Sequence, residues 1–457
     1  MAKEVIAILL CIVLALASCE ALPMDGNGGS GVGNVSAGDE DYDFSVFFGH
    51  AEDPINIARI ALRYKAETGV SVRPIMTAED AADDRFLTRY MSSADPPAAF
   101  ALPTDASDNV SAAGIGWRFH GRGFAADRRV LADLIGLPDA AAPAVDIFVE
   151  DIRLADYGEW SKFLNELDSY IKGDAYSTFI LNDKTYSFAG SKGRYSSQLS
   201  GVFAVSGADS LFTGTMLMDM ASVTTDIAPL ADLSLLTTPQ AFMSIQPVFD
   251  TYIEALGSYT SHIAGLYAPG IRGDDFISGK IYSSEYTELV FEANRAVFTP
   301  FDSENYTESA DATQAGHIAL LPIKMPYGEN WLRVYRGGAV ANSSLQMRTE
   351  YSFCVNEEAP SDIKAKAEAF VRWLADDTES SGAIQLCLAD YHAKGAELPL
   401  PTAKEREEAE GIAMFGEYIY DSILRHMLSD PDWQPDEMLA FRDALFAEWL
   451  SGNDGGY

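Results

Sequence analysis

One strand–helix–strand segment, residues 44–76, constrains the fold of this chain more than any other feature. Phe44-Ser-Val-Phe-Phe48 has the pattern of a short buried strand, and Gly49 ends it. Asp53-Pro54 then supplies an N-cap and a first-turn proline, apolar residues follow at helical spacing, and Gly69 ends the helix. Residues 70–76 return to a strand. Because two strands joined through a helix require a right-handed crossover, we expect a parallel sheet and an α/β fold.

Strands and helices continue to alternate along the rest of the chain. Trp160 and Trp373 fall on the apolar stripes of two predicted helices, so we assign both to cores. The further elements that we expect are a strand at Ala98–Leu102, helices at Ala78–Met91, Asp127–Ile135 and Tyr157–Ile171, a hairpin turning at Asn182-Asp-Lys184, and a long helix that begins at Ser361.

Length and charge limit the class of protein. A chain of 457 residues with 47% hydrophobic residues is too long for one ordinary core and suits two lobes. The net charge of −36 is spread along the chain, so the surface repels phosphate backbones and we expect no nucleic-acid partner. The same charge is repelled by an anionic membrane surface, so attachment to a membrane requires something other than charge.

The first residues predict such an attachment. The apolar run from Val5 to Leu16 is shorter than the roughly 20 residues of a membrane-spanning helix and fits a signal peptide. Leu16-Ala17-Ser18-Cys19 resembles a bacterial lipobox. That resemblance implies removal of residues 1–18 and diacylation of Cys19, which would hold the protein on the outer face of the cell membrane. The alternative is an ordinary secretory signal. Residues 19–42 are rich in Gly and acidic residues, which predicts a flexible tether.

Cysteine and histidine usage gives little support to a metal or cofactor. Besides Cys11 in the leader and the lipidation candidate Cys19, the chain has Cys354 and Cys387; a disulfide between them and two buried free thiols both remain open. The sequence contains no C-x-x-C, H-E-x-x-H or EF-hand pattern. We therefore expect neither a metal site nor a cofactor.

An ordered set of short motifs resembles the extracellular solute-binding proteins of ABC importers, family 1, the carbohydrate-binding class. The resemblance spans residues 43–450 and rests on the order of these stretches: Phe47-Phe-Gly-His50, Lys65-Ala-Glu-Thr-Gly-Val70, Arg295-Ala-Val-Phe-Thr-Pro-Phe-Asp302, Ile318-Ala-Leu-Leu-Pro-Ile323, Tyr335-Arg-Gly-Gly338, Tyr351–Asn356, the helix at Ala365–Leu374, and Gly395–Pro399. Arg295 departs from the lysine usual at that place in the family.

The resemblance implies two α/β lobes, each a mostly parallel sheet flanked by helices, with a ligand cleft between them. It places residues 43–112 and 334–401 in an N-terminal lobe, and residues 113–333 and 402–457 in a C-terminal lobe. The chain would cross between the lobes near Asp108–Gly116, Pro326–Arg333 and Pro401. It also implies a monomer that captures a small solute, a sugar or an oligosaccharide, and delivers it to the transmembrane subunits of an ABC permease.

Sugars offer C–H faces to aromatic rings and hydroxyl groups to polar side chains. Matched positions that supply such groups on loops at lobe edges are our candidates for ligand binding. Packing in a core is the alternative for each of them. The candidates are Gly49, His50, Trp117, Phe301, Asp302, Trp331, Tyr335, Arg336 and Gly337.

Two other functions remain open at this stage. A surface-anchored hydrolase would need paired carboxylates or an activated nucleophile, and no G-x-S-x-G motif or P-loop appears. A lipoprotein that senses a ligand for a signalling partner is the other. The ligand could also be a peptide, a polyamine or a metal ion, which proteins with related lobes bind.

Overall fold

The fold is seen in a computed structural model of the chain. The described residues are 42–49, 54–76, 91–93, 95–103, 114–203, 296–303, 317–326, 341–376 and 378–400, with a few residues between 251 and 259 and between 414 and 451. The lipobox, the tether up to residue 41, residues 78–90 of a predicted helix, most of the crossings predicted near Asp108–Gly116 and Pro326–Arg333, and the crossing at Pro401 lie outside them. No helix among the described residues is long and apolar enough to cross a membrane.

Nine of the described strands form one mixed sheet, and two more form a hairpin. The sheet has the order β2-β1-β3-β10-β4-β8-β7, with β9 also paired to β4 and β11 to β10. The strands are β1 Phe44–Gly49, β2 Val72–Met76, β3 Ala99–Pro103, β4 Ile115–Asp127, β5 Phe179–Leu181, β6 Lys184–Tyr186, β7 Gly201–Phe203, β8 Ala296–Asp302, β9 Ile318–Leu321, β10 Leu345–Val355 and β11 Glu397–Pro399.

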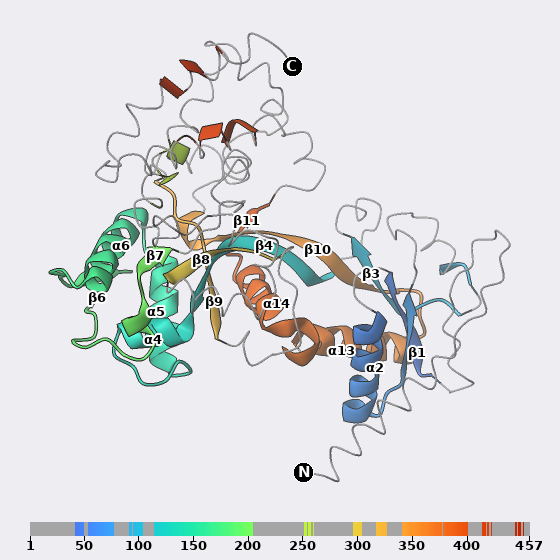
Figure 1. The fold of residues 1–457 in the computed structure, drawn as a ribbon. Helices are drawn as coiled ribbons and strands as arrows, with labels where there is room; N and C mark the ends of the chain where they lie inside the picture. The colour runs from blue at the N-terminus through green and yellow to red at the C-terminus, as the bar shows by residue number, and fades with distance from the viewer. Residues whose placement is uncertain are drawn as a thin grey trace, which may run out of the picture.

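Helices lie against this sheet at three places (Figure 1). One group accompanies β1–β3, another lies at the far end of the sheet beyond β4 and β8, and one helix lies between them against β4. The helices are α2 Pro54–Thr68, α4 Arg128–Leu134, α5 Pro143–Leu154, α6 Tyr157–Lys172, α13 Ser361–Asp376 and α14 Thr378–Ala393, with short 3-10 turns η2 Ser196–Gln198 and η5 Ala341–Ser343. The α/β class expected from the sequence is confirmed.

The strand–helix–strand segment folds as predicted. β1 and β2 pair in parallel from Phe44↔Val72 onwards, with α2 between them in the chain. Gly49 ends β1 with φ of 58°, a left-handed conformation that glycine adopts without steric cost. The hairpin prediction is also confirmed: β5 and β6 are antiparallel, and the turn residues Asn182 and Asp183 both have positive φ.

Two large hydrophobic cores lie at the two ends of the sheet. The first core joins β1, α2 and α13, with Phe48, Tyr64 and Phe370 among its buried residues. The second core joins α4, α5, α6, β7 and β8, and includes Trp160 and Phe298. Trp160 is 1% exposed, as expected for a core residue. Trp373 packs against the first core while its indole N–H donates to Glu67, so it is only half-buried.

The long strands β4 and β10 run from one core to the other. On β4, Trp117 packs in the first core and Phe124 in the second. On β10, Phe353 packs in the first core, whereas Leu345 packs against α14. The chain therefore passes between its two cores within continuous hydrogen-bonded strands. The predicted lobe boundaries stay a prediction.

Candidate functional site

Phe301 and Asp302, two of the predicted ligand residues, are neighbours at the end of β8. Successive side chains of a strand point to opposite faces of a sheet. Phe301 packs in a third apolar cluster with Leu388 and Tyr391 of α14. Asp302 therefore lies on the face of the sheet away from α14, and this face is where polar side chains gather.

Asp302 is the centre of a buried charge network. Register pairs Arg122 of β4 with Asp302 directly across the sheet. The Nε atom of Arg122 donates to Oδ2 of Asp302 at 2.6 Å, and Nε2 of His120 lies 2.8 Å from Oδ1. His120, Arg122 and Asp302 are 1%, 3% and 6% exposed. Three polar side chains at this depth require good mutual pairing, because unpaired buried charges are costly.

Strand β10 extends the network toward solvent. Gln346 lies opposite Arg122, and Arg348 lies opposite His120, so both share the face of their partners. Arg348 donates to Oε1 of Glu350 at 3.2 Å, and the same oxygen is 4.0 Å from Nδ1 of His120. The side chains of Arg348 and Glu350 are 20% and 34% exposed. We call the set His120, Arg122, Asp302, Gln346, Arg348 and Glu350 the polar strand face.

Each arginine of the polar strand face is paired with a carboxylate of the same face. Arg122 faces Asp302 and Arg348 faces Glu350, so each arginine has a carboxylate. The side-chain oxygen of Gln346 is buried and has no hydrogen-bond partner among the described residues. Planar amide, carboxylate, imidazole and guanidinium groups held in fixed positions provide both donors and acceptors. Such an arrangement suits a neutral ligand with many hydroxyl groups.

The remaining predicted site residues are dispersed or not described. Gly49 lies at the end of β1, which is separated from β8 by β3, β10 and β4 in the sheet. Trp117 is 3% exposed and packs edge-on to Phe48 and tilted against Phe353, so core packing accounts for it without a ligand. The structure does not describe His50, Trp331, Tyr335, Arg336, Gly337 or the lipidation site Cys19.

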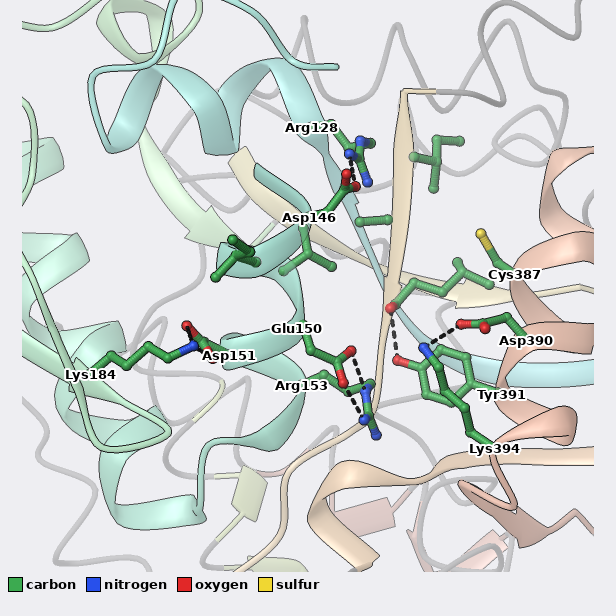
Figure 2. Close-up of a pocket in the computed structure, with 15 residues that line it drawn as sticks. Arg128, Asp146, Glu150, Asp151, Arg153, Lys184, Cys387, Asp390, Tyr391 and Lys394 are labelled. Atoms are coloured by element: carbon green, nitrogen blue, oxygen red, sulfur yellow. Dashed lines mark hydrogen bonds and ion pairs between the residues drawn. The ribbon is translucent and has the colours of Figure 1, made fainter. Parts of the chain in front are cut away.

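A separate pocket of about 510 Å³ lies between α5, β9 and α14, as Figure 2 shows. Its floor is apolar and its rim is charged. The lining residues are Arg128, Asp146, Ile147, Val149, Glu150, Asp151, Arg153, Lys184, Ile318, Ala319, Leu320, Cys387, Asp390, Tyr391 and Lys394. Because α14 packs on the face of β4 away from His120 and Arg122, this groove and the polar strand face lie on opposite sides of the long strands.

The charges of the groove are paired within each helix. On α5, Arg153 donates to Oε1 of Glu150 at 2.6 Å, and this contact lowers the pKa of Glu150 and raises that of Arg153. Beyond the last turn of α14, Lys394 donates to Asp390 at 2.7 Å. The guanidinium of Arg153 also lies 5.7 Å from the ring centre of Tyr391, and the Tyr391 hydroxyl donates to the Leu320 carbonyl. Figure 2 shows these two sets of side chains facing each other across the groove.

Lys324 fixes the end of α5 to the chain that leaves the second core. The residue is 1% exposed. Its ammonium donates to the carbonyl oxygens of Arg153, Ala155 and Asn342, each at 2.7 Å. Burial, with help from the charge of Arg153, lowers the pKa of Lys324 to about 7. The three acceptors match the three N–H donors of an ammonium and oppose that shift. The contact holds three chain segments at one point.

Cys354 and Cys387 are free thiols, which decides between the two possibilities left by the sequence. Burial raises the pKa of both, that of Cys387 to about 11. Among the described residues, no group of three or more His, Cys, Asp or Glu side chains is placed to hold a metal ion.

Sequence reasoning missed the partners of Asp302. Trp117 was a candidate, but His120 and Arg122 of the same strand were not. The signal was present in the alternation of β4: Phe119, Gly121 and Gly123 on one face, His120 and Arg122 on the other. The pairing with β8 joins residues 180 positions apart, and this separation hides it from local pattern analysis.

Comparison with known proteins gives structural similarity only. No protein-family model matches the chain, and no curated protein matches it. Similar solved structures are of the class expected from the sequence. A family 1 extracellular solute-binding protein from Bifidobacterium longum subsp. infantis is 10% identical, covers 90% of this chain and 100% of its own, and has a TM-score of 0.35.

Two further solved structures have a similar identity and TM-score. The apo form of RafE from Streptococcus pneumoniae is 11% identical over 90% of this chain and 99% of its own, with a TM-score of 0.38. A binding protein, MsmE, from Bacillus subtilis is 12% identical over 90% and 98%, with a TM-score of 0.37.

Proposed function

We propose that this chain is a non-catalytic, lipid-anchored solute-binding protein that captures a sugar or oligosaccharide and delivers it to an ABC permease. One observation carries the proposal: the polar strand face is a buried, charge-balanced network on strands that continue from one hydrophobic core into the other. A ligand held there would contact the strands about which the two cores can bend toward each other. Hinge closure around a ligand is the signal that a transporter can recognise.

The chemistry of the network supports a neutral polyhydroxyl ligand over a charged one. Among the described residues, each arginine of the polar strand face faces a carboxylate, so these pairs attract an anion or a polyamine less than unpaired charges would. Gln346, Arg348 and Glu350 can donate to or accept from hydroxyl groups without losing these pairs, since an arginine has five donors and a carboxylate accepts several bonds. Similar structures named above belong to the same class, and others are described as bound to α-D-tagatose and to maltotriose.

The membrane anchor is a separate part of the proposal and has its own test. Cys19 would carry the lipid, and the Gly-rich residues after it would give the folded part freedom to reach the permease. Intact-mass analysis of the protein from a bacterial membrane should show a chain that begins at Cys19 with the mass of a lipid added. Cys19→Ser should release the protein from the membrane fraction. A chain of Cys19→Ser that stays in that fraction would exclude this anchor.

Ligand binding is best tested by thermal shift of the purified protein against mono- and oligosaccharides, peptides and polyamines. A ligand that binds only the folded state, at a hundredfold excess over its dissociation constant, stabilises by about 2.7 kcal/mol. We expect a saturable shift with one class of sugar, and the sugar should be recovered chemically intact. A shift that fades while the sugar is hydrolysed would favour a hydrolase instead.

Variants link that binding to the polar strand face. Glu350→Gln should weaken the sugar-dependent shift, because it removes the charge at the solvent-reaching end of the network. Glu368→Gln is the matched control: it makes the same change on α13, where the side chain is 42% exposed and pairs with Arg372 at 3.9 Å. Equal loss of binding in both variants, or in neither, would move the ligand away from the polar strand face.

A further inference from the structure

Gln346 of β10 carries a buried oxygen atom that stabilises nothing in the described part of the fold. The residue is 5% exposed, and its Oε1 atom accepts no hydrogen bond from any residue that the structure describes. A buried acceptor without a donor destabilises a folded protein, because it loses its hydrogen bonds to water and gains none in return. Such a group in a native protein calls for a reason other than stability.

The neighbours of Gln346 in the sheet explain why this oxygen has no donor. Residues directly opposite each other on paired strands lie on the same face. On one side Gln346 lies opposite Arg122, whose Nε atom donates to Asp302. On the other side it lies opposite Leu398 of β11, whose side chain has no donor. The row from Asp302 to Leu398 crosses four strands, and it changes from polar to apolar at Gln346.

A ligand can reach Gln346 along the polar strand face. Arg348 is two residues further along β10 and bonds to Glu350, and the side chains of these two residues are 20% and 34% exposed. The polar strand face therefore has a solvent-reaching end at Glu350 and a buried end at Gln346. Two residues of an extended strand span about 7 Å, so a ligand that contacts Arg348 can extend its inner end to Gln346.

A second glutamine, on the opposite face of β4, shows what this side chain does when it supports the fold. Gln385 of α14 accepts from the N–H of Phe119 at 2.9 Å and donates to the carbonyl oxygen of Phe119 at 3.0 Å. Both polar atoms of its amide are used, and these bonds hold α14 against β4. The oxygen of Gln346 has no such bond among the described residues, so the two glutamines have different roles.

We propose that Gln346 determines ligand specificity by accepting a hydrogen bond from one hydroxyl group at the inner end of a bound sugar. The inference rests on the proposed function and deepens it, since it names the group of the ligand that is recognised. A sugar without that hydroxyl group leaves the oxygen buried and unpaired, which penalises its binding. Leu398 beside Gln346 favours C–H groups over a second hydroxyl group. The preferred ligand is therefore a sugar that presents one donor hydroxyl group next to an apolar edge.

The first experiment compares Gln346→Met with Gln385→Met, because methionine is an unbranched side chain without an amide. Gln346→Met should leave the urea unfolding midpoint unchanged or raise it, since an apolar group replaces an unpaired acceptor. It should weaken binding of the sugar identified by thermal shift about tenfold to a hundredfold in a calorimetric titration. Gln385→Met is the matched control: it should lower the unfolding midpoint and leave the sugar affinity unaltered.

The second experiment titrates analogues of that sugar, each lacking one hydroxyl group. One analogue should bind the unchanged protein about tenfold to a hundredfold more weakly than the complete sugar. Gln346→Met should bind the same analogue as well as it binds the complete sugar. Circular dichroism melting identifies a variant that fails to fold, and Gln346→Leu then takes the place of Gln346→Met. An unchanged protein that tolerates the loss of every hydroxyl group would overturn the inference without any variant.

The outcomes separate the role of Gln346 from the proposed function. If Gln346→Met binds the sugar as well as the unchanged protein does, or if its unfolding midpoint falls as far as that of Gln385→Met, the role of Gln346 is wrong and the proposed function stands. If a peptide or a polyamine binds in place of any sugar, and Gln346→Met weakens that binding, the proposed function is wrong and Gln346 remains the acceptor that the ligand meets. Binding of no ligand from these classes would reject both.

Discussion

Replacing Asp302 with Asn tests whether the polar strand face is an integral, buried ion network. The substitution keeps the size of the side chain and removes its charge. Asp302 is 6% exposed, and it faces Arg122, which is 3% exposed, at 2.6 Å. Breaking a buried pair by removing one partner costs about 3–5 kcal/mol, because the remaining charge stays desolvated. We expect urea unfolding of Asp302→Asn to show a loss of this size.

A matched pair on the surface gives the scale for comparison. Asp95 and Arg73 form a pair at 3.0 Å with side chains 75% and 42% exposed. Asp95→Asn should cost less than about 1 kcal/mol, since water screens an exposed pair. The cycle of Asp302→Asn with Arg122→Gln should give a coupling energy of about 0.5–3 kcal/mol. A loss at Asp302 no larger than that at Asp95, or a coupling energy near zero, would refute the buried network.

Three further predictions concern the frame around the site. The pKa of Lys324 is lowered from 10.5 to about 7 in the folded protein, so between these pH values the unfolded chain binds more protons than the folded one. The free energy of unfolding should therefore rise with pH from about 7 to 10.5. Lys324→Met should remove this rise, as measured by urea unfolding midpoints at several pH values. Gly123→Ala should cost about 1–3 kcal/mol in thermal or urea unfolding, because its Cβ would lie 2.3 Å from a carbonyl oxygen of β9, whereas Gly190→Ala, with nothing within 4 Å, should cost much less. Alkylation followed by peptide mapping should find the buried Cys354 unmodified in the folded protein, and both Cys354 and Cys387 modified after unfolding without reductant; peptides joined by a disulfide would contradict this.

Elements specified by neighbouring residues were predictable from the sequence. The strand β1, the helix α2 with Pro54 at its start, and the hairpin at Asn182 each depend on side chains a few positions apart. The helix α5 was missed although the signal was there. Pro143 opens it, and Val145, Phe148 and Ile152 recur at the spacing of one helical face.

The site depended on contacts that the sequence does not display. Asp302 was selected because it matches a position of the resembled family. Its pairing with Arg122 becomes apparent only when β8 is paired with β4 in the observed register. Trp117 was selected as an aromatic residue at a matched position, but the odd positions of β4 face helices, so its ring packs with Phe48 and Phe353. A shift of one residue in the strand register moves every side chain to the opposite face of the sheet, so it would have exchanged the positions that pack with those on the polar strand face. The sequence therefore indicates which residues are polar or aromatic, and pairing decides which of them meet.

Strand alternation also explains how β4 separates polar from apolar side chains. Even positions of β4 place His120 and Arg122 on the polar strand face, and odd positions place Phe119 and Gly121 against α14. The ladder between β4 and β10 has register shifts between Thr349 and Ser352, and a bulge of this kind bends its strand and redirects the side chains beside it. Glu350 lies within this irregular stretch, with its Oε1 atom 3.2 Å from Arg348 and 4.0 Å from Nδ1 of His120. The charge at the solvent-reaching end of the polar strand face therefore lies where β10 departs from regular pairing.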